Sequence, residues 1–290
     1  MHLPKINLKA EEKKIVSFIA DTFKKANKHS AIVAVSGGVD SATSLLLAVK
    51  ALGPENVLAL HMPSKSSDPK HARDIKSLLG AVKLPVENFI TINIGSIIQK
   101  TWKIIKHYAG KEVRPLSEVG PLKTANKGTP DRTKINAEIA RLNKLRLANM
   151  AARVRMVVLY DQAKLENALV VGTENYSEQM LGYFTRFGDE ASDIEPIRHL
   201  YKTQVYELAK HLGVPKEIVV KEPSADLWRG QTDEGELGFS YAQADPILAM
   251  FAQGKSSEDM IKAGCDKKLV EAVLNQVRAN NFKHKVPHKV

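Results

Sequence analysis

Short apolar runs alternate with segments of helical periodicity along most of the chain. Four mainly apolar runs, at 31–35, 56–60, 88–92 and 168–172, predict buried strands. Apolar residues that recur every three or four positions predict helices at 9–25, 42–49, 69–79, 95–108, 133–165 and 201–212. Because the strands alternate with helices, we expect an α/β fold with a doubly wound parallel sheet flanked by helices.

The second half of the chain is less regular. Residues 111–132 are rich in Pro, Gly, Lys and Thr and predict a long loop before the helix at 133–165. That helix either runs unbroken, with an apolar face available for a subunit interface, or breaks near Asn143 or Asn149. Residues 173–193 are polar and predict an irregular segment, and short helices are expected at 245–251, 257–263 and 267–279. We therefore expect one domain over 1–290, with a flexible loop at 113–132 and a basic tail at 280–290.

One turn between a predicted strand and helix has the composition of a phosphate-binding loop. It consists of six residues, Ser36, Gly37, Gly38, Val39, Asp40 and Ser41. Glycines let the backbone approach a phosphate closely, and free N–H groups at a helix start bind anions. The Gly-Lys-Ser/Thr ending of the P-loop and the GxGxxG pattern are both missing. SGGxDS instead resembles the pyrophosphate loop of the ATP pyrophosphatases, in which we expect Asp40 to bind Mg²⁺.

A second polar cluster follows the predicted strand at 168–172. The carboxyl ends of parallel strands meet at one edge of a sheet, so this cluster is expected near the glycine loop. Glu178 is a candidate for a second carboxylate ligand of Mg²⁺. The alternative is that Thr173 or Asn175 caps a helix and that Glu178 is solvated.

Composition limits the class of protein. The chain has 290 residues, 43% of them hydrophobic, with a formal net charge of +11 and a single cysteine, Cys265. One cysteine excludes a disulfide framework and a clustered-cysteine metal site. Neither an apolar run of membrane-spanning length nor an N-terminal signal core is evident, so we expect a cytoplasmic protein without a membrane partner. The positive charge fits a nucleic acid, ATP or a dinucleotide, or simply a solvated surface.

Several long motifs in order resemble the ammonia-dependent NAD synthetase family. They are SGGVDSA (36–42), NMAARVRM (149–156), VGTENYSEQMLGYFTRFGDEASDIEPI (171–197), LYKTQV (200–205) and EPSADLWRGQTDEGELGFSY (222–241). The resemblance implies an adenine nucleotide alpha hydrolase-like, Rossmann-like fold. It also implies a ligase that amidates deamido-NAD with ammonia through a NAD-adenylate, giving NAD, AMP and pyrophosphate in the last step of NAD biosynthesis. Mg²⁺ as cofactor and a homodimer, with no nucleic-acid partner, follow from the same resemblance.

The resemblance also assigns roles to residues. Asp40, Glu178 and Lys202 are expected to be catalytic, with Asp40 and Glu178 on the metal. ATP is expected to bind to the loop 36–41 and to Thr173, Lys202 and Ser224. The deamido-NAD site is expected to contain Arg153, Arg186, Asp193, His284 and Lys285.

The sequence departs from the family pattern at a few positions. Arg186 stands where the family commonly has lysine, and the tail that holds His284 and Lys285 is shorter than usual. The chain has no segment resembling a glutaminase with a nucleophilic cysteine, so free ammonia is the expected nitrogen donor.

Rival interpretations fit less well. The synthetase half of GMP synthetase lacks the long motifs quoted above, and tRNA-thiolating enzymes rely on several cysteines. A nucleic-acid-binding protein with a vestigial loop would form no AMP.

Overall fold

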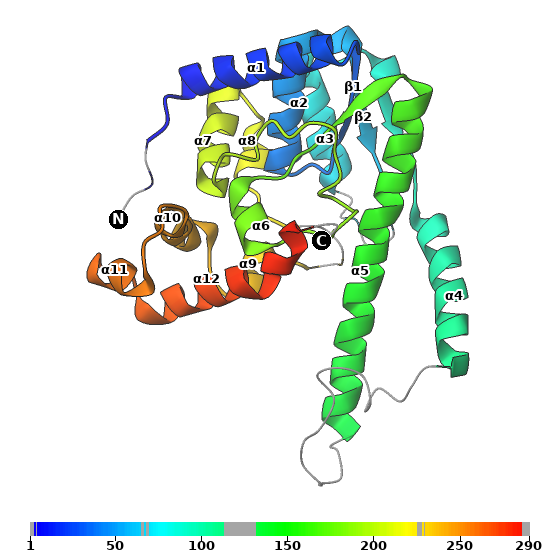
Figure 1. Ribbon diagram of the computed structural model, residues 1–290. Coiled ribbons are helices and arrows are strands. Elements are labelled where there is room, and N and C mark those ends of the chain that lie inside the picture. Colours follow the sequence, from blue (N-terminus) through cyan, green and yellow to red (C-terminus); the bar gives the residue numbers. More distant parts are fainter. Residues whose placement is uncertain are drawn as a thin grey trace.

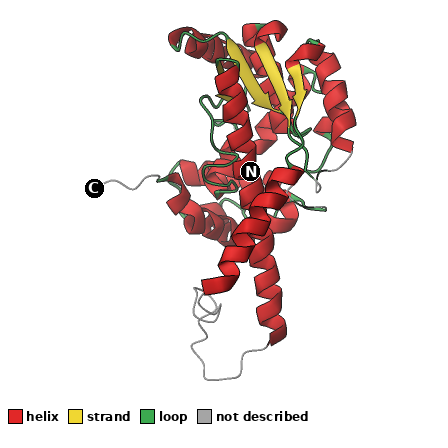
Figure 2. Ribbon diagram, turned by 90° about the vertical axis from the view of Figure 1, so that its right-hand side faces the viewer, coloured by secondary structure: helices red, strands yellow, loops and turns green. Residues whose placement is uncertain are grey.

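A four-stranded parallel sheet lies at the centre of the computed structural model, which describes residues 3, 5–64, 67, 70–112, 132–224, 228 and 230–285. The strands are β1 (Ser30–Ala34), β2 (Val57–His61), β3 (Phe89–Thr91) and β4 (Ala168–Val171), in the order β3-β2-β1-β4 (Figure 2). All four coincide with predicted strands to within one or two residues. The winding direction reverses between β1 and β4, which pair in register from Ser30–Ala168 to Val33–Val171. The doubly wound parallel sheet is therefore confirmed.

Helices cover both faces of the sheet (Figure 1). One face packs against α1 (Leu8–Lys25), α2 (Val39–Leu52), α3 (Lys70–Val82) and α7 (Lys202–Leu212). The other packs against α4 (Gly95–Glu112) and α5 (Arg132–Leu165). Side chains of a strand point alternately to the two faces, so Ala31 and Val33 enter the first core and Ile32 enters the second. Burial on both faces explains why β1 is apolar throughout.

A separate helical layer forms the C-terminal part of the chain. It contains α6 (Tyr176–Leu181), α10 (Tyr241–Ala252), α11 (Ser257–Lys262) and α12 (Lys267–Asn280), which share an apolar cluster. Two short helices, α8 (Lys216–Val219) and α9 (Asp233–Leu237), and three 3-10 turns, η1 (Pro54–Asn56), η2 (Val86–Asn88) and η5 (Asn281–His284), complete the described elements. The helix predicted at 245–251 begins earlier, because Ser240 and Gln243 form a capping box at its N-terminus.

The structure decides two of the expectations. The long helix runs unbroken, as the first alternative expected, since α5 spans 34 residues, and Asn149 accepts a hydrogen bond from Thr185 at 2.9 Å. The segment at 173–193 is not irregular throughout, because Asn175 caps α6 and Gly182 ends it in the left-handed conformation. The loop predicted at 113–132 lies almost wholly outside the described residues, as do the Asp68-Pro69 helix start and residues 286–290 of the tail. Within the part of the chain that is described, a search for membrane-spanning helices identifies no candidate.

Candidate active site

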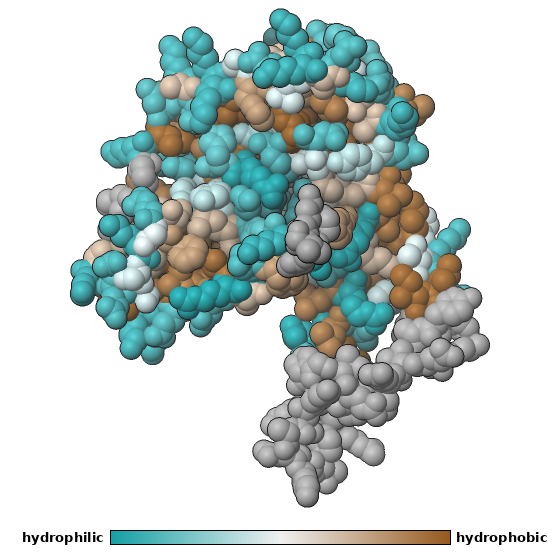
Figure 3. Space-filling view, in the orientation of Figure 1, coloured by the Kyte–Doolittle hydropathy of each residue, from teal (hydrophilic) through white to brown (hydrophobic). Residues whose placement is uncertain are grey.

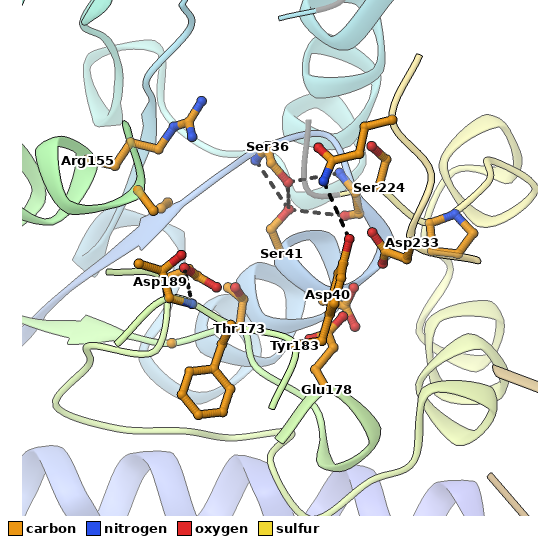
Figure 4. A pocket seen from close by; sticks show the side chains of 18 of the residues that line it. Ser36, Asp40, Ser41, Arg155, Thr173, Glu178, Tyr183, Asp189, Ser224 and Asp233 are labelled. Atoms are coloured by element: carbon orange, nitrogen blue, oxygen red, sulfur yellow. Dashed lines mark hydrogen bonds between the residues drawn. The ribbon is translucent and has the colours of Figure 1, made fainter. Parts of the chain in front are cut away.

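A pocket of about 520 Å³ opens at the carboxyl ends of β1 and β4. Ligands of open α/β sheets bind where the winding direction reverses, and here that point lies between these two strands. Every residue predicted to bind ATP lines the pocket, namely Ser36, Gly37, Gly38, Val39, Asp40, Ser41, Thr173, Lys202 and Ser224. Figure 4 shows the two serines of the loop facing Asp40 and Glu178 across the pocket.

The glycine loop is held by hydrogen bonds among its own residues. The hydroxyl of Ser41 donates to the Gly38 carbonyl at 3.1 Å, and its oxygen lies 3.2 Å from that of Ser36. The Gly38 N–H donates to the Ser36 hydroxyl at 3.2 Å. Gly37 has φ +80°, a conformation that side chains disfavour. No side chain caps the N-terminus of α2 after Gly38, so its first N–H groups remain available to an anion.

Three charged side chains from three helices meet beside this loop. The Lys202 ammonium donates to Asp40 at 2.6 Å and to Glu178 at 2.8 Å, although only 2% of Lys202 is exposed. Burial disfavours the charged ammonium, but the carboxylates of Asp40 and Glu178 outweigh it, and the pKa of Lys202 lies well above its ordinary value. Burial raises the pKa of Glu178 to about 8, against the opposing effect of Lys202. The cluster is thus a paired, largely desolvated set of charges.

Asn175 links the two carboxylates. Its side-chain oxygen accepts from the Glu178 N–H at 3.0 Å, and its amide donates to Asp40 at 3.0 Å. The Glu178 carboxylate in turn accepts from the Asn175 N–H at 3.4 Å, which completes a capping box. Asn175 caps α6, as the alternative interpretation expected, but Glu178 is not solvated, because one carboxylate oxygen accepts from Asn175 and the other contacts Lys202.

A second acidic group borders the cluster. Asp233, at the start of α9, is 3% exposed and accepts from the Tyr241 hydroxyl at 3.2 Å. Burial raises the pKa of Asp233, partly offset by Lys202. Nearby, Tyr183 donates to Glu236 at 2.6 Å. Tyr183, Asp233 and Glu236 thus form part of the wall of the pocket.

A buried acidic pair lies behind the end of β4. The Glu174 N–H donates to the Glu195 carboxylate at 3.2 Å, and Ser192 donates to the same carboxylate at 2.7 Å. Burial raises the pKa of Glu174 to about 9 and that of Glu195 to about 7, and Arg198 opposes both shifts. The guanidinium of Arg198 pairs with Glu174 at 3.3 Å. This pair supports the strand end without lining the described pocket.

The five residues predicted to bind deamido-NAD lie near the pocket, but they are absent from its described lining. The Arg153 guanidinium donates to the Arg186 carbonyl at 3.1 Å, and Arg186 lies 5.2 Å from the Phe282 ring. His284 packs on Phe184 with ring centroids 5.6 Å apart. The Asp193 carboxylate accepts from the N–H of Val170 at 2.8 Å, so it fixes the end of β4. For Lys285 no contact is described.

Several lining residues were missed from the sequence. Arg155, Asp189, Lys221, Asp233 and Lys283 all line the pocket. Asp189 and Asp233 lie inside motifs that carry the family resemblance, so the resemblance could have identified them as candidate site residues. Burial raises the pKa of Asp189, while hydrogen bonds from Thr185 act in the opposite direction. The Lys283 ammonium donates to the carbonyls of Gly182 and Phe184 at 2.6 and 3.0 Å, and burial lowers its pKa. Lys283, two residues before Lys285, thus lines the described pocket.

The carboxylates of Asp40 and Glu178 are suited to Mg²⁺. Both are oxygen donors that already surround a single cation, the Lys202 ammonium. Among the described residues no group of three or more His, Cys, Asp or Glu side chains could form a complete metal cage. Mg²⁺ usually takes one or two carboxylates, with waters and substrate phosphates completing its octahedron. The donor set therefore fits a metal that arrives with a nucleotide.

Comparisons with known proteins agree with this geometry. Residues 11–287 match the NAD synthase family. The chain is 36% identical over 283 residues to an NH3-dependent NAD(+) synthetase of Fusobacterium nucleatum, covering 97% of this chain and 95% of the other. Among solved structures it resembles an NMN synthetase of Francisella tularensis, with TM-score 0.75, 29% identity and 99% of each chain covered. It also resembles an NH3-dependent NAD synthetase of Campylobacter jejuni, with TM-score 0.70, 29% identity and coverage of 98% and 100%.

Proposed function

The chain belongs to the NAD synthase family, and on that basis we propose that its pocket catalyses the ATP-dependent amidation of deamido-NAD with ammonia. The reaction gives NAD, AMP and pyrophosphate, which makes the protein a carbon–nitrogen ligase in the last step of NAD biosynthesis. The observation that carries the proposal is the convergence of Asp40, Glu178 and Lys202 beside a glycine loop at the reversal point of the sheet. We place the reaction in the cytoplasm.

The loop is proposed to bind the β- and γ-phosphates of ATP. Ser36 and Ser41 supply hydroxyl groups, and the start of α2 supplies backbone N–H groups. Thr173 and Ser224, which line the same pocket, are proposed to contact the nucleotide. With the outer phosphates held in this way, the α-phosphorus becomes the electrophile and pyrophosphate becomes the leaving group.

Charge neutralisation dominates the first step, because two anions must meet. The nicotinate carboxylate oxygen forms a bond to the α-phosphorus, and the bond from that phosphorus to pyrophosphate breaks. Asp40 and Glu178 would hold Mg²⁺, which when bound supplies positive charge to the phosphates. Lys202 is proposed to stabilise the negative charge that develops on the α-phosphoryl oxygens, since its ammonium is held charged in a desolvated position.

Ammonia completes the reaction by attacking the activated carbonyl carbon. The mixed anhydride is needed because the oxygen of a free carboxylate is a very poor leaving group. The carbon–nitrogen bond forms, the bond to the AMP oxygen breaks, and a proton leaves the nitrogen. The Asp189 carboxylate lines the pocket, and we propose that it faces this nitrogen.

The deamido-NAD site remains a prediction. Arg153, Arg186, Asp193, His284 and Lys285 are its proposed members, and Lys283 joins them because its ammonium lines the pocket. The Arg153 guanidinium donates to the backbone carbonyl of Arg186, so the two residues are in contact.

The subunit partner is proposed to be a second copy of this chain. On α5, Val157 and Leu165 are 71% and 72% exposed, and Ile104 on α4 is 57% exposed. Figure 3 shows hydrophobic surface along the α5 side of the molecule. Apolar surface of this kind marks an interaction site. Sedimentation of the protein at micromolar concentration tests this proposal, and a monomer under those conditions contradicts it.

A coupled assay tests the activity. Protein supplied with deamido-NAD, ATP, Mg²⁺ and ammonium should form NAD and AMP in equal amounts, whereas glutamine alone should give no product. Formation of ADP in place of AMP refutes adenylation.

The resemblance to an NMN synthetase favours a second acceptor, the corresponding mononucleotide. Comparison of kcat/KM for the two acceptors decides which one the pocket prefers.

A further inference from the structure

Lys221 is a pocket lysine to which the reaction described above gives no role. It lies in the loop after α8, and its side chain is 28% exposed. The Lys221 ammonium donates to the carbonyl of Gly37 at 2.9 Å and forms an ion pair with Asp74 of α3. The glycine loop, α3 and the loop after α8 are distant in sequence, and they meet at one peptide group of the glycine loop.

The peptide that Lys221 contacts is the one between Gly37 and Gly38. In a trans peptide the carbonyl and the next N–H point in opposite directions. The Gly38 N–H donates to the Ser36 hydroxyl, on the opposite side of the peptide from the contact with Lys221. Fixing the carbonyl therefore also fixes the direction of the N–H.

Besides the contact with Lys221, the bond from the Gly38 N–H to the Ser36 hydroxyl holds this peptide. A flip changes ψ of Gly37 and φ of Gly38, and both residues lack the Cβ that would restrict the change. After a flip the Gly37 carbonyl oxygen would take the place of the N–H, and an anion in the loop would face a partial negative charge.

We propose that Lys221 is a positioning residue that locks the Gly37–Gly38 peptide in its anion-binding orientation, with Asp74 holding the ammonium over the carbonyl. The proposal rests on the assignment of the loop to the phosphates of ATP. Lys221 acts through the backbone of the loop, so its removal weakens phosphate binding much more than it affects the acceptor.

Binding of inorganic pyrophosphate with Mg²⁺, measured by titration calorimetry, tests the proposal without requiring turnover. Lys221→Met should raise the Kd for pyrophosphate by about 10- to 100-fold, the effect of losing one charged hydrogen bond. Its KM for ATP should rise similarly, with KM for deamido-NAD and Tm unchanged. Lys221→Arg should restore binding, and Lys216→Met, an exposed change on α8, serves as the matched control.

Two further measurements separate the proposed role from others. Asp74→Asn should weaken pyrophosphate binding less than Lys221→Met does, because the amide oxygen can still accept a hydrogen bond from the Lys221 ammonium. A crystal structure of Lys221→Met should show the Gly37 carbonyl turned toward the pocket. The proposal is overturned if wild type and Lys221→Met bind pyrophosphate equally well, or if the Gly37 carbonyl keeps its orientation in Lys221→Met. It is also overturned if Asp74→Asn binds pyrophosphate as weakly as Lys221→Met. Wild-type protein that does not bind pyrophosphate would instead refute the assignment of the loop.

Discussion

Replacing Asp40 with Asn tests the paired carboxylates most directly. The amide has nearly the shape of the carboxylate, so the contact with Asn175 can persist. Lys202 keeps Glu178 at 2.8 Å, and its charge therefore does not remain unpaired. The substitution removes one charged hydrogen bond, worth about 1.5–3 kcal/mol, and it also relieves repulsion among the neighbouring carboxylates. We expect a folded variant whose free energy of unfolding differs from wild type by less than this amount.

Catalysis should suffer much more than stability. Loss of one electrostatic contact at a transition state typically lowers kcat about 10²- to 10³-fold. At about 1.4 kcal/mol per factor of ten, this corresponds to roughly 3–4 kcal/mol. Because Asp40 is also a proposed metal ligand, the Mg²⁺ concentration that gives half-maximal activity should rise. The assay is NAD formation at saturating ATP and deamido-NAD across a Mg²⁺ titration, with circular dichroism and Tm as checks on folding.

The reasoning fails if the folded Asp40→Asn variant keeps kcat within about ten-fold of wild type at saturating Mg²⁺. It also fails if activity falls while the Mg²⁺ dependence stays unchanged, since Asp40 would then not contact the metal. Asp21→Asn, an exposed carboxylate change on α1, is the matched control and should leave both quantities unaltered.

Three other changes have defined outcomes. Burial raises the pKa of Glu11, but the hydrogen bonds and charges of His199 and Lys14 together outweigh the effect of burial. The net shift is downward, and the stabilisation, at most about 1 kcal/mol, is lost on acidification. Urea unfolding should therefore separate Glu11→Gln from wild type at pH 7 but not at pH 3. Gly172→Ala should lower Tm, at a cost of about 1–3 kcal/mol, because its Cβ would overlap the buried Glu195 carboxylate. Asp245→Ala should cost more than about 2 kcal/mol in urea unfolding and lower kcat, because this buried carboxylate ties α6 and α7 to α10.

Local signals predicted the sheet well. The central strands β1 and β4 were recognised because a strand buried on both faces is apolar along its whole length. Helix ends were harder to predict. The helix predicted to start at 245 begins at Tyr241, because the Ser240 capping box and burial of the helix outweigh the hydrogen bond lost at Pro246. The continuity of α5 at Asn149 likewise depends on a distant partner, Thr185.

The ATP side of the site was more predictable than the acceptor side. The loop at 36–41 lies within a single strand–turn–helix unit, so its spacing in the sequence also fixes its geometry. Residues proposed for deamido-NAD come from α5, the segment after α6 and the tail, and their relative positions depend on how these pack together. Consequently Lys283 was overlooked in favour of Lys285, although only Lys283 lines the described pocket.

By itself the sequence determined the class of the fold, the glycine loop between β1 and α2, and the family, because these depend on neighbouring residues and on motifs in a fixed order. The tertiary structure alone decided that Lys202, on an amphipathic helix whose lysines are usually solvated, is buried between Asp40 and Glu178. It also decided that Lys221 contacts the Gly37 carbonyl. The physical reason is that charge pairing and burial arise between segments far apart in the chain, and a linear pattern carries no information about their distance.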